Sequence, residues 1–325
     1  MTARVRAYFL GGTIGMAGHE GGVVSRLRAA DLVASVPGLG DLDVALDLVD
    51  FRSMPSANLS FADIAELASE AAASDADGVV VVQGTDTLEE TAYLLDLLWP
   101  EARPLVVTGA MRNPALAGSD GPANLLAAIR VAAGPELRDQ GALVVANDQV
   151  HAARFVRKTH STNPATFASP NAGPLGLMVE GRPVSVTSVV RRRTHVLQGP
   201  PDARVALHVA TLGDRGETVP GLVASSDGLV VAGLGVGHVS EQLAEALVEA
   251  AQRVPVVLAS RTGAGPVLTS TYGFVGSETY LLNHGLFGAG LLDPLKARVL
   301  LAVALGAGYD ADGIRAAFAD ASGVD

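Results

Sequence analysis

Short apolar runs alternate with longer amphipathic segments through the first half of the chain. The clearest apolar run is four consecutive valines at residues 79–82, which is typical of a strand buried on both faces of a sheet. Strand patterns cover about residues 4–10, 44–50, 78–83, 104–109 and 141–146, and helical patterns cover about residues 28–35, 60–74, 87–98 and 122–133. This alternation predicts an α/β fold with a parallel sheet covered by helices on both faces.

The alternation breaks after Val190, where three arginines are followed by a polar stretch with two consecutive prolines. Strand patterns resume at residues 205–210, 229–232 and 254–259. We therefore predict a larger N-terminal parallel-sheet domain and a smaller C-terminal α/β domain. Their predicted bounds are residues 1–188 for the first domain, 189–203 for a linker and 204–325 for the second domain.

The composition is that of a folded protein with large buried surfaces. The 325 residues are enough for two domains, 49% of them are hydrophobic and only 18% are charged. This low charge content also indicates interfaces between subunits. The net charge is −11, and the only dense basic cluster is residues 191–193, so nucleic acids and anionic membranes are poor candidates for partners.

The residue types that are absent exclude several kinds of chemistry. The chain has no cysteine, so disulfides, thiol catalysis and zinc-thiolate sites are excluded. No apolar run approaches the length of about 18 residues that a membrane-spanning helix needs. The N-terminus also lacks the pattern of a signal peptide, and we therefore predict a soluble, cytoplasmic protein.

Residues with reactive or hydrogen-bonding groups follow each of the five predicted strands. They are Gly12 and Thr13 after the first strand, Ser56 after the second, Gly84, Thr85 and Asp86 after the third, Ala110 after the fourth, and Lys158 farther along after the fifth. The carboxyl ends of parallel strands meet at one edge of a sheet, so these groups are expected to converge. Each has a structural alternative, such as capping of the next helix by Asp86 or Thr87. Together they predict a site.

The chemistry that this set supports is acyl transfer. A threonine hydroxyl is a weak nucleophile and needs an adjacent base, which Lys158 can provide to Thr85 while Asp86 orients the lysine. Backbone amides at Gly12, Gly84 and Ala110 are candidates for stabilising an oxyanion. Without Thr85, Lys158 would be better explained as an exposed charge in the basic run 154–158.

With these motifs in place, the chain resembles the bacterial L-asparaginase and glutaminase family nearly from end to end. The matching segments are GGTI at residues 11–14, QGTDTLEETA at 83–92, GAMR at 109–112, SDGPANL at 119–125 and KARV at 296–299. The resemblance implies hydrolysis of L-asparagine to L-aspartate and ammonia through a threonine acyl-enzyme, with weaker action on glutamine possible. It also implies that no metal or organic cofactor takes part.

The resemblance assigns roles to individual residues of the first domain. Thr13 corresponds to the first nucleophile, and Thr85 with Lys158 and Asp86 corresponds to the second threonine and its partners. It further implies that Asp86 binds the α-amino group of the substrate and Ser56 its α-carboxylate. Ala110 would offer its backbone carbonyl to the side-chain amide, beside Gly12 and Gly84.

For the second domain, the resemblance implies that a glutamate of a neighbouring subunit contacts the substrate's amino group. The matching residue is Glu278, and His238 lies where the family approaches the same site. Each has a structural alternative, a charge at a helix N-terminus for Glu278 and a turn residue for His238. The shared site implies a homotetramer built as a dimer of dimers.

Two positions depart from the family pattern. The family's lid carries a tyrosine, but residues 15–31 contain none. Candidates for its replacement are His19, Glu20, Ser25 and Arg26. Ala57 stands beside Ser56, where many relatives have a side chain that touches the substrate, so the preference between asparagine and glutamine stays open. The alignment also leaves Ser53 as an alternative to Ser56.

Other reaction classes lack their motifs. Residues 233–238 are glycine-rich but lack the spacing of a dinucleotide fingerprint, and the sequence contains no phosphate-binding loop, zinc-protease motif or serine-hydrolase elbow. Two alternative functions remain at this stage. One is an amidotransferase-type subunit that supplies ammonia to a partner chain. The other is a non-catalytic amino-acid binding protein, which the missing lid tyrosine makes conceivable.

Overall fold

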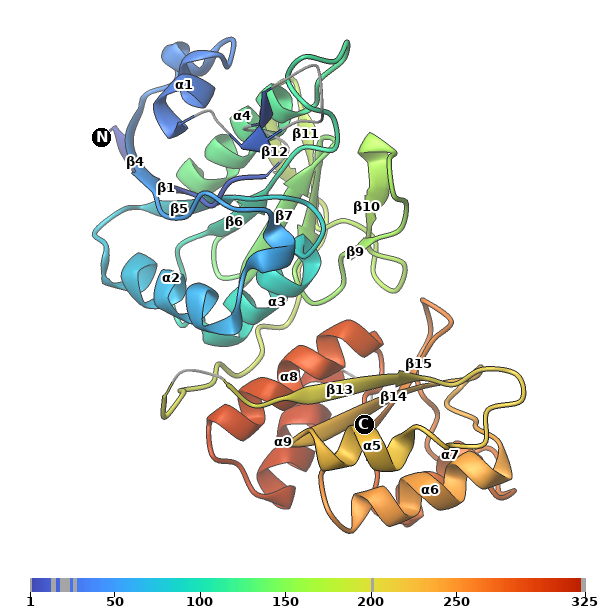
Figure 1. The fold of residues 1–325 in the computed structure, drawn as a ribbon. Helices are drawn as coiled ribbons and strands as arrows, with labels where there is room; N and C mark the ends of the chain where they lie inside the picture. Colours follow the sequence, from blue (N-terminus) through green and yellow to red (C-terminus); the bar gives the residue numbers. More distant parts are fainter. Residues whose placement is uncertain (1, 13–15, 18–23, 26–27, 200–201, 323–325) are drawn as a thin grey trace. The chain divides into compact units, whose positions relative to one another are not determined.

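The computed structural model describes residues 2–12, 16–17, 24–25, 28–199 and 202–322 of the chain. It consists of two compact units, Met1–Thr194 and His195–Asp325, each with its own sheet and core (Figure 1). The α/β architecture predicted from the sequence is confirmed in both units. The bounds of the predicted linker stay a prediction. No helix in the described part of the chain is both long and apolar enough to span a bilayer.

The five strands predicted in the first domain are all present and mutually parallel. They are β1 (Ala3–Phe9), β4 (Val44–Asp50), β5 (Gly78–Val82), β6 (Leu105–Thr108) and β7 (Ala142–Ala146). Their spatial order is β4-β1-β5-β6-β7, so the order reverses between β1 and β5. Ligand sites of open α/β sheets lie at such a reversal, outside the carboxyl ends of the strands.

The sheet continues beyond β7 with three antiparallel strands that the sequence pattern did not indicate. They are β8 (Gln149–Ala152), β11 (Gly176–Val179) and β12 (Arg182–Ser185). The turn into β8 is made by Asn147 and Asp148, both at positive φ, which is the geometry of a tight two-residue hairpin. The N-terminal sheet is therefore mixed, and eight of its strands lie in the described part of the chain.

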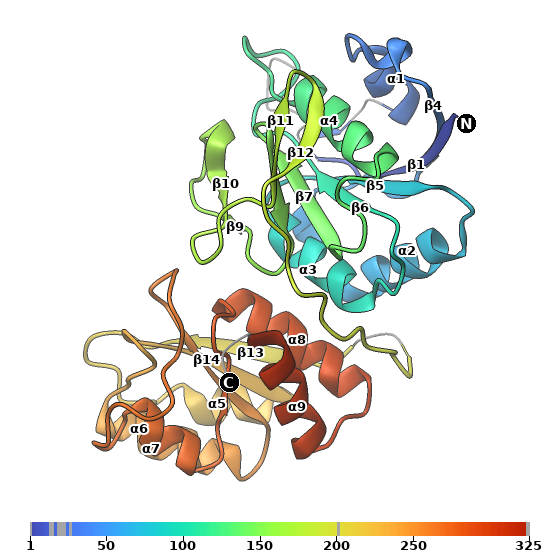
Figure 2. The same cartoon turned by 180° about the vertical axis from the view of Figure 1, so that it is seen from behind.

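The four predicted helices of this unit cover the two faces of the sheet (Figures 1 and 2). They are α1 (Ala29–Ala34), α2 (Phe61–Ala73), α3 (Leu88–Leu98) and α4 (Gly121–Ala133). Helices α2 and α3 pack against each other on one face, whereas α1 and α4 share a core on the other face. The connections β5–α3–β6 and β6–α4–β7 both step from one strand to the next in the same direction across the sheet, but α3 and α4 lie on opposite faces. The two crossovers therefore have opposite hands. This is rare, because almost all parallel crossovers are right-handed.

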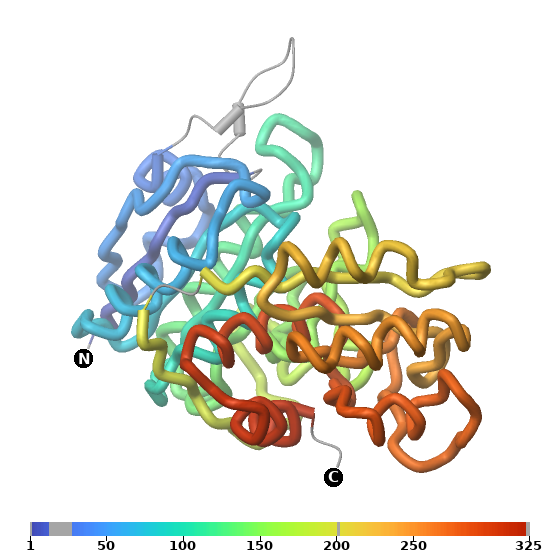
Figure 3. The backbone as a smooth tube through the Cα atoms, turned by 60° about the horizontal axis from the view of Figure 1, so that its bottom comes forward, coloured from blue at the N-terminus to red at the C-terminus, as the bar shows by residue number. Residues whose placement is uncertain are grey.

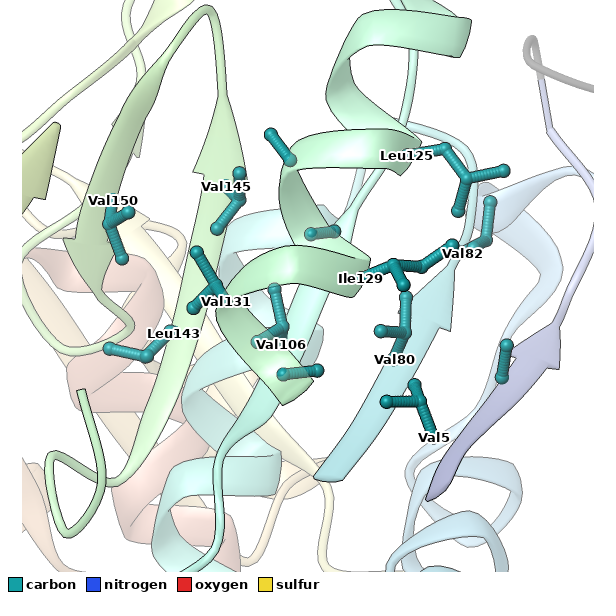
Figure 4. Close-up of a cluster of buried hydrophobic side chains, with 14 of the residues drawn as sticks. Val5, Val80, Val82, Val106, Leu125, Ile129, Val131, Leu143, Val145 and Val150 are labelled. Atoms are coloured by element: carbon teal, nitrogen blue, oxygen red, sulfur yellow. The ribbon is translucent and has the colours of Figure 1, made fainter. Parts of the chain in front are cut away.

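The valine strand β5 is the central one of the five parallel strands, and its four valines are 0% exposed. Val80 and Val82 point toward α4, where they meet Leu125 and Ile129 (Figure 4). Val79 and Val81 alternate to the other face, as side chains in a strand must. The prediction of a strand buried on both faces is confirmed.

The C-terminal unit contains a second, smaller parallel sheet. Its strands, in spatial order, are β13 (Val205–Val209), β14 (Gly228–Gly233), β15 (Val256–Ser260) and β16 (Phe287–Gly288). Its helices are α5 (Val219–Ala224), α6 (Glu241–Ala251), α7 (Glu278–Asn283), α8 (Pro294–Gly306) and α9 (Ala311–Ser322). Helix α8 packs on β13 to β15 and against α9, which forms the dark red end of the tube in Figure 3. The three strands predicted here are confirmed.

Several short elements stand outside the two main sheets. Strands β2 (Met16–Ala17) and β3 (Val24–Ser25) form an antiparallel pair, and β9 (Arg157–Lys158) pairs in the same way with β10 (Phe167–Ala168). Short 3₁₀ turns cover Leu39–Asp41, Ser56–Asn58 and Pro164–Thr166. The pair β9–β10 matters for the site, because it carries Lys158.

Two glycines allow the backbones of the chain segments after β1 and β5 to come into close contact. Gly12 has φ 99°, and a Cβ atom placed on it would lie 2.2 Å from the backbone nitrogen of Gly84. Any side chain at Gly12 would therefore collide with backbone, which cannot move aside. This contact brings the end of β1 directly against the end of β5 at the reversal of strand order.

The contact between Gly12 and Gly84 gives a stability prediction with a matched control. Gly38 also has positive φ, at 76°, but a Cβ there would meet nothing within 4 Å. Both Gly→Ala changes should lower the free energy of unfolding by about 1–2 kcal/mol, because alanine must adopt a backbone conformation at positive φ. Gly12→Ala should lose a further ~1–3 kcal/mol because of the collision. Urea unfolding of both variants measures this difference, and equal losses would contradict the close contact.

The partly buried side chain of Asp96, on α3, gives a pH-dependent prediction. Asp96 Oδ1 accepts a hydrogen bond from the Ala142 N–H at 2.8 Å, and burial raises the pKa of Asp96 to about 6 despite that donor. The folded state therefore binds the proton of Asp96 more tightly than the unfolded chain does. The stabilisation of the folded state by this proton is complete at about pH 4 and below, and it is lost as the pH rises through 6. Asp96→Asn keeps an acceptor but carries no charge. It should raise the free energy of unfolding at pH 8 by about 2–3 kcal/mol.

The gain from Asp96→Asn should disappear at about pH 4, where the wild-type carboxyl is already neutral. Asp77→Asn is the control, since Asp77 also accepts a backbone N–H, from Arg4 at 2.8 Å, but is exposed. Thermal unfolding followed by circular dichroism at the two pH values checks both variants. A gain for Asp96→Asn that is the same at pH 4 and pH 8 would refute the argument.

Candidate active site

The end of β5 and the start of α3 form the centre of the candidate site. The valine strand ends at Val82, Gly84 follows it, Thr85 and Asp86 form the turn, and α3 begins at Leu88. Thr85 is only 6% exposed. The side chain of Asp86, by contrast, is 72% exposed. The turn therefore presents a shielded hydroxyl next to an accessible carboxylate.

Lys158 joins this pair, as the sequence predicted. Its Nζ lies 2.9 Å from Thr85 Oγ1 and 3.0 Å from Asp86 Oδ1. The lysine side chain is only 16% exposed, so the alternative of a solvated surface charge does not describe it. These distances fall in the range of 2.6–3.2 Å that nucleophile–base pairs use. Threonine, lysine and aspartate thus form a hydroxyl–amine–carboxylate chain.

Glu89 and Thr87 take part in this arrangement, although the sequence interpretation gave neither a role in the site. Glu89 Oε2 accepts the backbone N–H of Lys158 at 3.0 Å. Thr87 Oγ1 donates to the backbone carbonyl of Ser56 at 3.0 Å, which ties the loop after β4 to the start of α3. Both residues belong to the long matching motif, and their partners are far away in sequence, so no local pattern could reveal these contacts.

Ser56 lies beside Gly84 at the end of the loop after β4. Its side chain is 2% exposed, and Ser56 Oγ has no hydrogen-bond partner among the described residues. A Cβ placed on Gly84 would come within 2.8 Å of that oxygen. Ser53, the alternative in the alignment, is exposed, as is Ala57. A buried hydroxyl without a partner is costly, which makes Ser56 a candidate for contact with a ligand.

Ala110 lies at the carboxyl end of β6 and is 1% exposed. The loop that contains it is held by two side chains near the start of α4. Asn124 Nδ2 donates to the Gly109 carbonyl at 3.0 Å, and the two carboxylate oxygens of Asp120 accept the N–H groups of Met111 and Arg112 at 2.9 and 2.8 Å. The matching motif at residues 119–125 therefore acts as the anchor of the Ala110 loop.

The first-nucleophile candidate and most of the lid lie outside the described residues. They include Thr13, His19, Glu20 and Arg26. Ser25 belongs to β3, but its side chain is not described. Gly12 is the last described residue before this segment, and it is in contact with Gly84. The roles expected for these lid residues stay predictions.

In the C-terminal unit, Glu278 and His238 contact each other. Glu278 is 0% exposed, its Oε2 lies 3.1 Å from His238 Nε2, and its Oε1 accepts the N–H groups of Thr271 and Tyr272 at 3.1 and 2.8 Å. Burial alone would raise the pKa of Glu278, but these donors hold it below its ordinary value. The carboxylate therefore stays charged and organises the loop around it.

Two aromatic side chains flank His238. The ring centroids of Tyr272 and Phe274 lie 4.8 and 5.0 Å from that of His238, both in edge-to-face contact, and both side chains are well exposed. The role of Glu278 and His238 in a shared site stays a prediction. Across the described ranges, no cluster of three or more histidine, aspartate or glutamate side chains could hold a metal ion.

The chain is similar to known proteins over most of its length. Residues 4–191 match the family "Asparaginase, N-terminal", and residues 204–318 match "Glutaminase/Asparaginase C-terminal domain". A probable L-asparaginase of Deinococcus radiodurans is 36% identical over 312 residues, which cover 92% of this chain and 95% of that protein. A glutaminase-asparaginase of Pseudomonas fluorescens biotype A is 32% identical over 91% of this chain and 84% of that protein.

The fold agrees as well. The crystal structure of a probable cytoplasmic L-asparaginase from Campylobacter jejuni matches with a TM-score of 0.87 at 30% identity, covering 98% of this chain and 99% of that chain. Motifs, both domain matches and the architecture thus lead to one conclusion. The chain belongs to the L-asparaginase and glutaminase family.

Proposed function

We propose that this protein is an L-asparaginase, which hydrolyses the side-chain amide of L-asparagine to L-aspartate and ammonia. The observation that carries the proposal is the position of Lys158 Nζ, within hydrogen-bond distance of both Thr85 Oγ1 and Asp86 Oδ1. A lysine held between a buried hydroxyl and a carboxylate is suited to accept a proton from that hydroxyl. The names of the relatives support the same reaction.

The proposed reaction has two steps. In the first, Thr13 attacks the amide carbon and its proton passes to the departing nitrogen, which leaves as ammonia while an ester forms on Thr13. In the second, the pair of Thr85 and Lys158 takes a proton from a water molecule that attacks the ester, and aspartate leaves as Thr13 regains its proton. Backbone N–H groups at the contact of Gly12 and Gly84 are the proposed oxyanion donors.

Substrate recognition follows from the remaining groups of the site. The exposed carboxylate of Asp86 is proposed to bind the α-ammonium group, and Ser56 Oγ, which has no partner among the described residues, the α-carboxylate. Ala110 offers its backbone carbonyl to the side-chain amide. The glutaminase-asparaginase relative supports a weaker activity on glutamine. The small side chain of Ala57 does not predict the ratio of asparaginase to glutaminase activity, which an assay with both substrates measures.

We further propose a cytoplasmic homotetramer, built as a dimer of dimers, in which each C-terminal unit completes the site of a neighbouring subunit. The ordered carboxylate of Glu278 supports this role, because it is charged and fixed by the loop at residues 271–272. The second carboxylate oxygen of Glu278, Oε2, lies within hydrogen-bond distance of His238 Nε2. The likeness to a probable cytoplasmic asparaginase supports the location.

Removing the hydroxyl of Thr85 tests the proposed chemistry. Thr85→Val keeps the size of the side chain, and it should lower the kcat for ammonia release from L-asparagine by about 10²–10⁴-fold. Lys158→Met should have an effect of the same size. Thr91→Val, at a buried threonine on α3, is the control and should keep near wild-type turnover. Steady-state ammonia assays over L-asparagine and L-glutamine provide the measurement.

Three results of these assays separate the possible functions. Full turnover by Thr85→Val would refute the mechanism. Binding of asparagine by calorimetry without ammonia release, in the wild-type protein, would indicate an amino-acid binding protein instead. Ammonia release that depends on a second, larger chain would indicate an amidotransferase-type subunit.

Mixed oligomers test the shared site. Thr85→Val and Glu278→Gln should each be poorly active alone, but a hybrid dimer of one of each contains one intact site out of two. Such hybrids, purified through two different tags after co-expression, should recover about half of the wild-type turnover, as two-fold symmetry requires. Hybrids without recovery, or a fully active monomer in light scattering, would refute the shared site.

A further inference from the structure

Lys158 comes from a segment that its own secondary structure holds weakly. Strand β9 consists of Arg157 and Lys158 alone, and in the described sheets it pairs only with the two residues of β10. Such a short ladder has little stability of its own. Proton transfer nevertheless requires Lys158 Nζ to stay within hydrogen-bond reach of Thr85 Oγ1. The next residue, Thr159, donates its N–H to the Thr166 carbonyl at 2.8 Å, but the N–H of Lys158 itself is held by a contact outside the pair β9–β10.

Glu89 provides that contact. Its Oε2 accepts the backbone N–H of Lys158 at 3.0 Å, while the other end of the same lysine lies 2.9 Å from Thr85 Oγ1 and 3.0 Å from Asp86 Oδ1. The three partners all fall within residues 85–89, at the start of α3. Both ends of Lys158 are therefore held by one short, rigid segment of the first domain.

The burial of Glu89 is not explained by its place at a helix N-terminus. An acidic side chain there complements the helix dipole while remaining in water. Glu90 is the next residue in the same turn and is more exposed than Glu89, which is only 7% exposed. A carboxylate is costly to bury unless hydrogen bonds compensate it, so the Lys158 N–H is a reason for Glu89 to face inward.

We propose that Glu89 is the positioning residue of the catalytic lysine: by binding the backbone of Lys158, it sets the distance between Lys158 Nζ and Thr85 Oγ1. The inference rests on the proposed function of the Thr85 centre. Glu89 touches neither substrate nor the transferred proton in this role. Its effect is on geometry, and a misplacement of about 1 Å is enough to cost about 10²-fold in rate.

Kinetics of three variants test the proposal. Glu89→Ala removes the acceptor and should lower kcat for ammonia release by about 10²-fold with little change in KM, because binding groups such as Asp86 stay in place. Glu89→Gln keeps a carbonyl oxygen for the same N–H and should restore kcat to within about tenfold of wild type. Glu90→Ala is the matched control and should leave both constants near wild type.

Crystal structures of the wild type and Glu89→Ala provide a readout that does not depend on turnover. The distance between Lys158 Nζ and Thr85 Oγ1 should exceed 3.5 Å in the variant, compared with 2.9 Å in the wild type. An unchanged distance, or an equal loss of kcat in Glu90→Ala, would overturn the proposal. If the wild type releases no ammonia, the proposed function fails, but the two structures still decide the positioning role.

Discussion

The backbone contact between Gly12 and Gly84 is the constraint on which the rest of the site depends. It lies where the strand order reverses, so the segments after β1 and β5 leave the sheet side by side. A side chain at Gly12 would push the two segments apart. This contact fixes the position of Gly84, and with it the start of the Thr85 turn, against Gly12, and the remaining described groups are arranged around it.

Around this contact, each element of the site is anchored by a contact made over a long distance in sequence. Thr87 ties Ser56 to the start of α3, Asn124 holds the loop of Ala110, and Glu89 holds Lys158. These anchors use side chains that contribute no reactive group to the proposed chemistry. The long shared motif at residues 83–92 therefore contains Thr85 and Asp86 of the proposed centre together with Thr87 and Glu89, which anchor Ser56 and Lys158.

The groups of the proposed site differ in their exposure to solvent. Thr85 and Lys158 are shielded, which strengthens the interactions between them because less water competes. Asp86 reaches solvent, where it can meet an incoming ammonium group. In the C-terminal unit, Glu278 is fixed by its own loop and paired with His238, so its charge is held in place before any ligand arrives.

The sequence by itself determined the two α/β units, the five parallel strands and the catalytic candidates Thr85, Asp86 and Lys158, because strand and helix periodicity and the order of motifs are local properties. Only the tertiary structure decided that the sheet continues through β8, β11 and β12, that Ser56 lies beside Gly84, and that Glu89 binds the backbone of Lys158. Those features depend on contacts between residues far apart in the chain, and such contacts leave no periodic trace in the sequence.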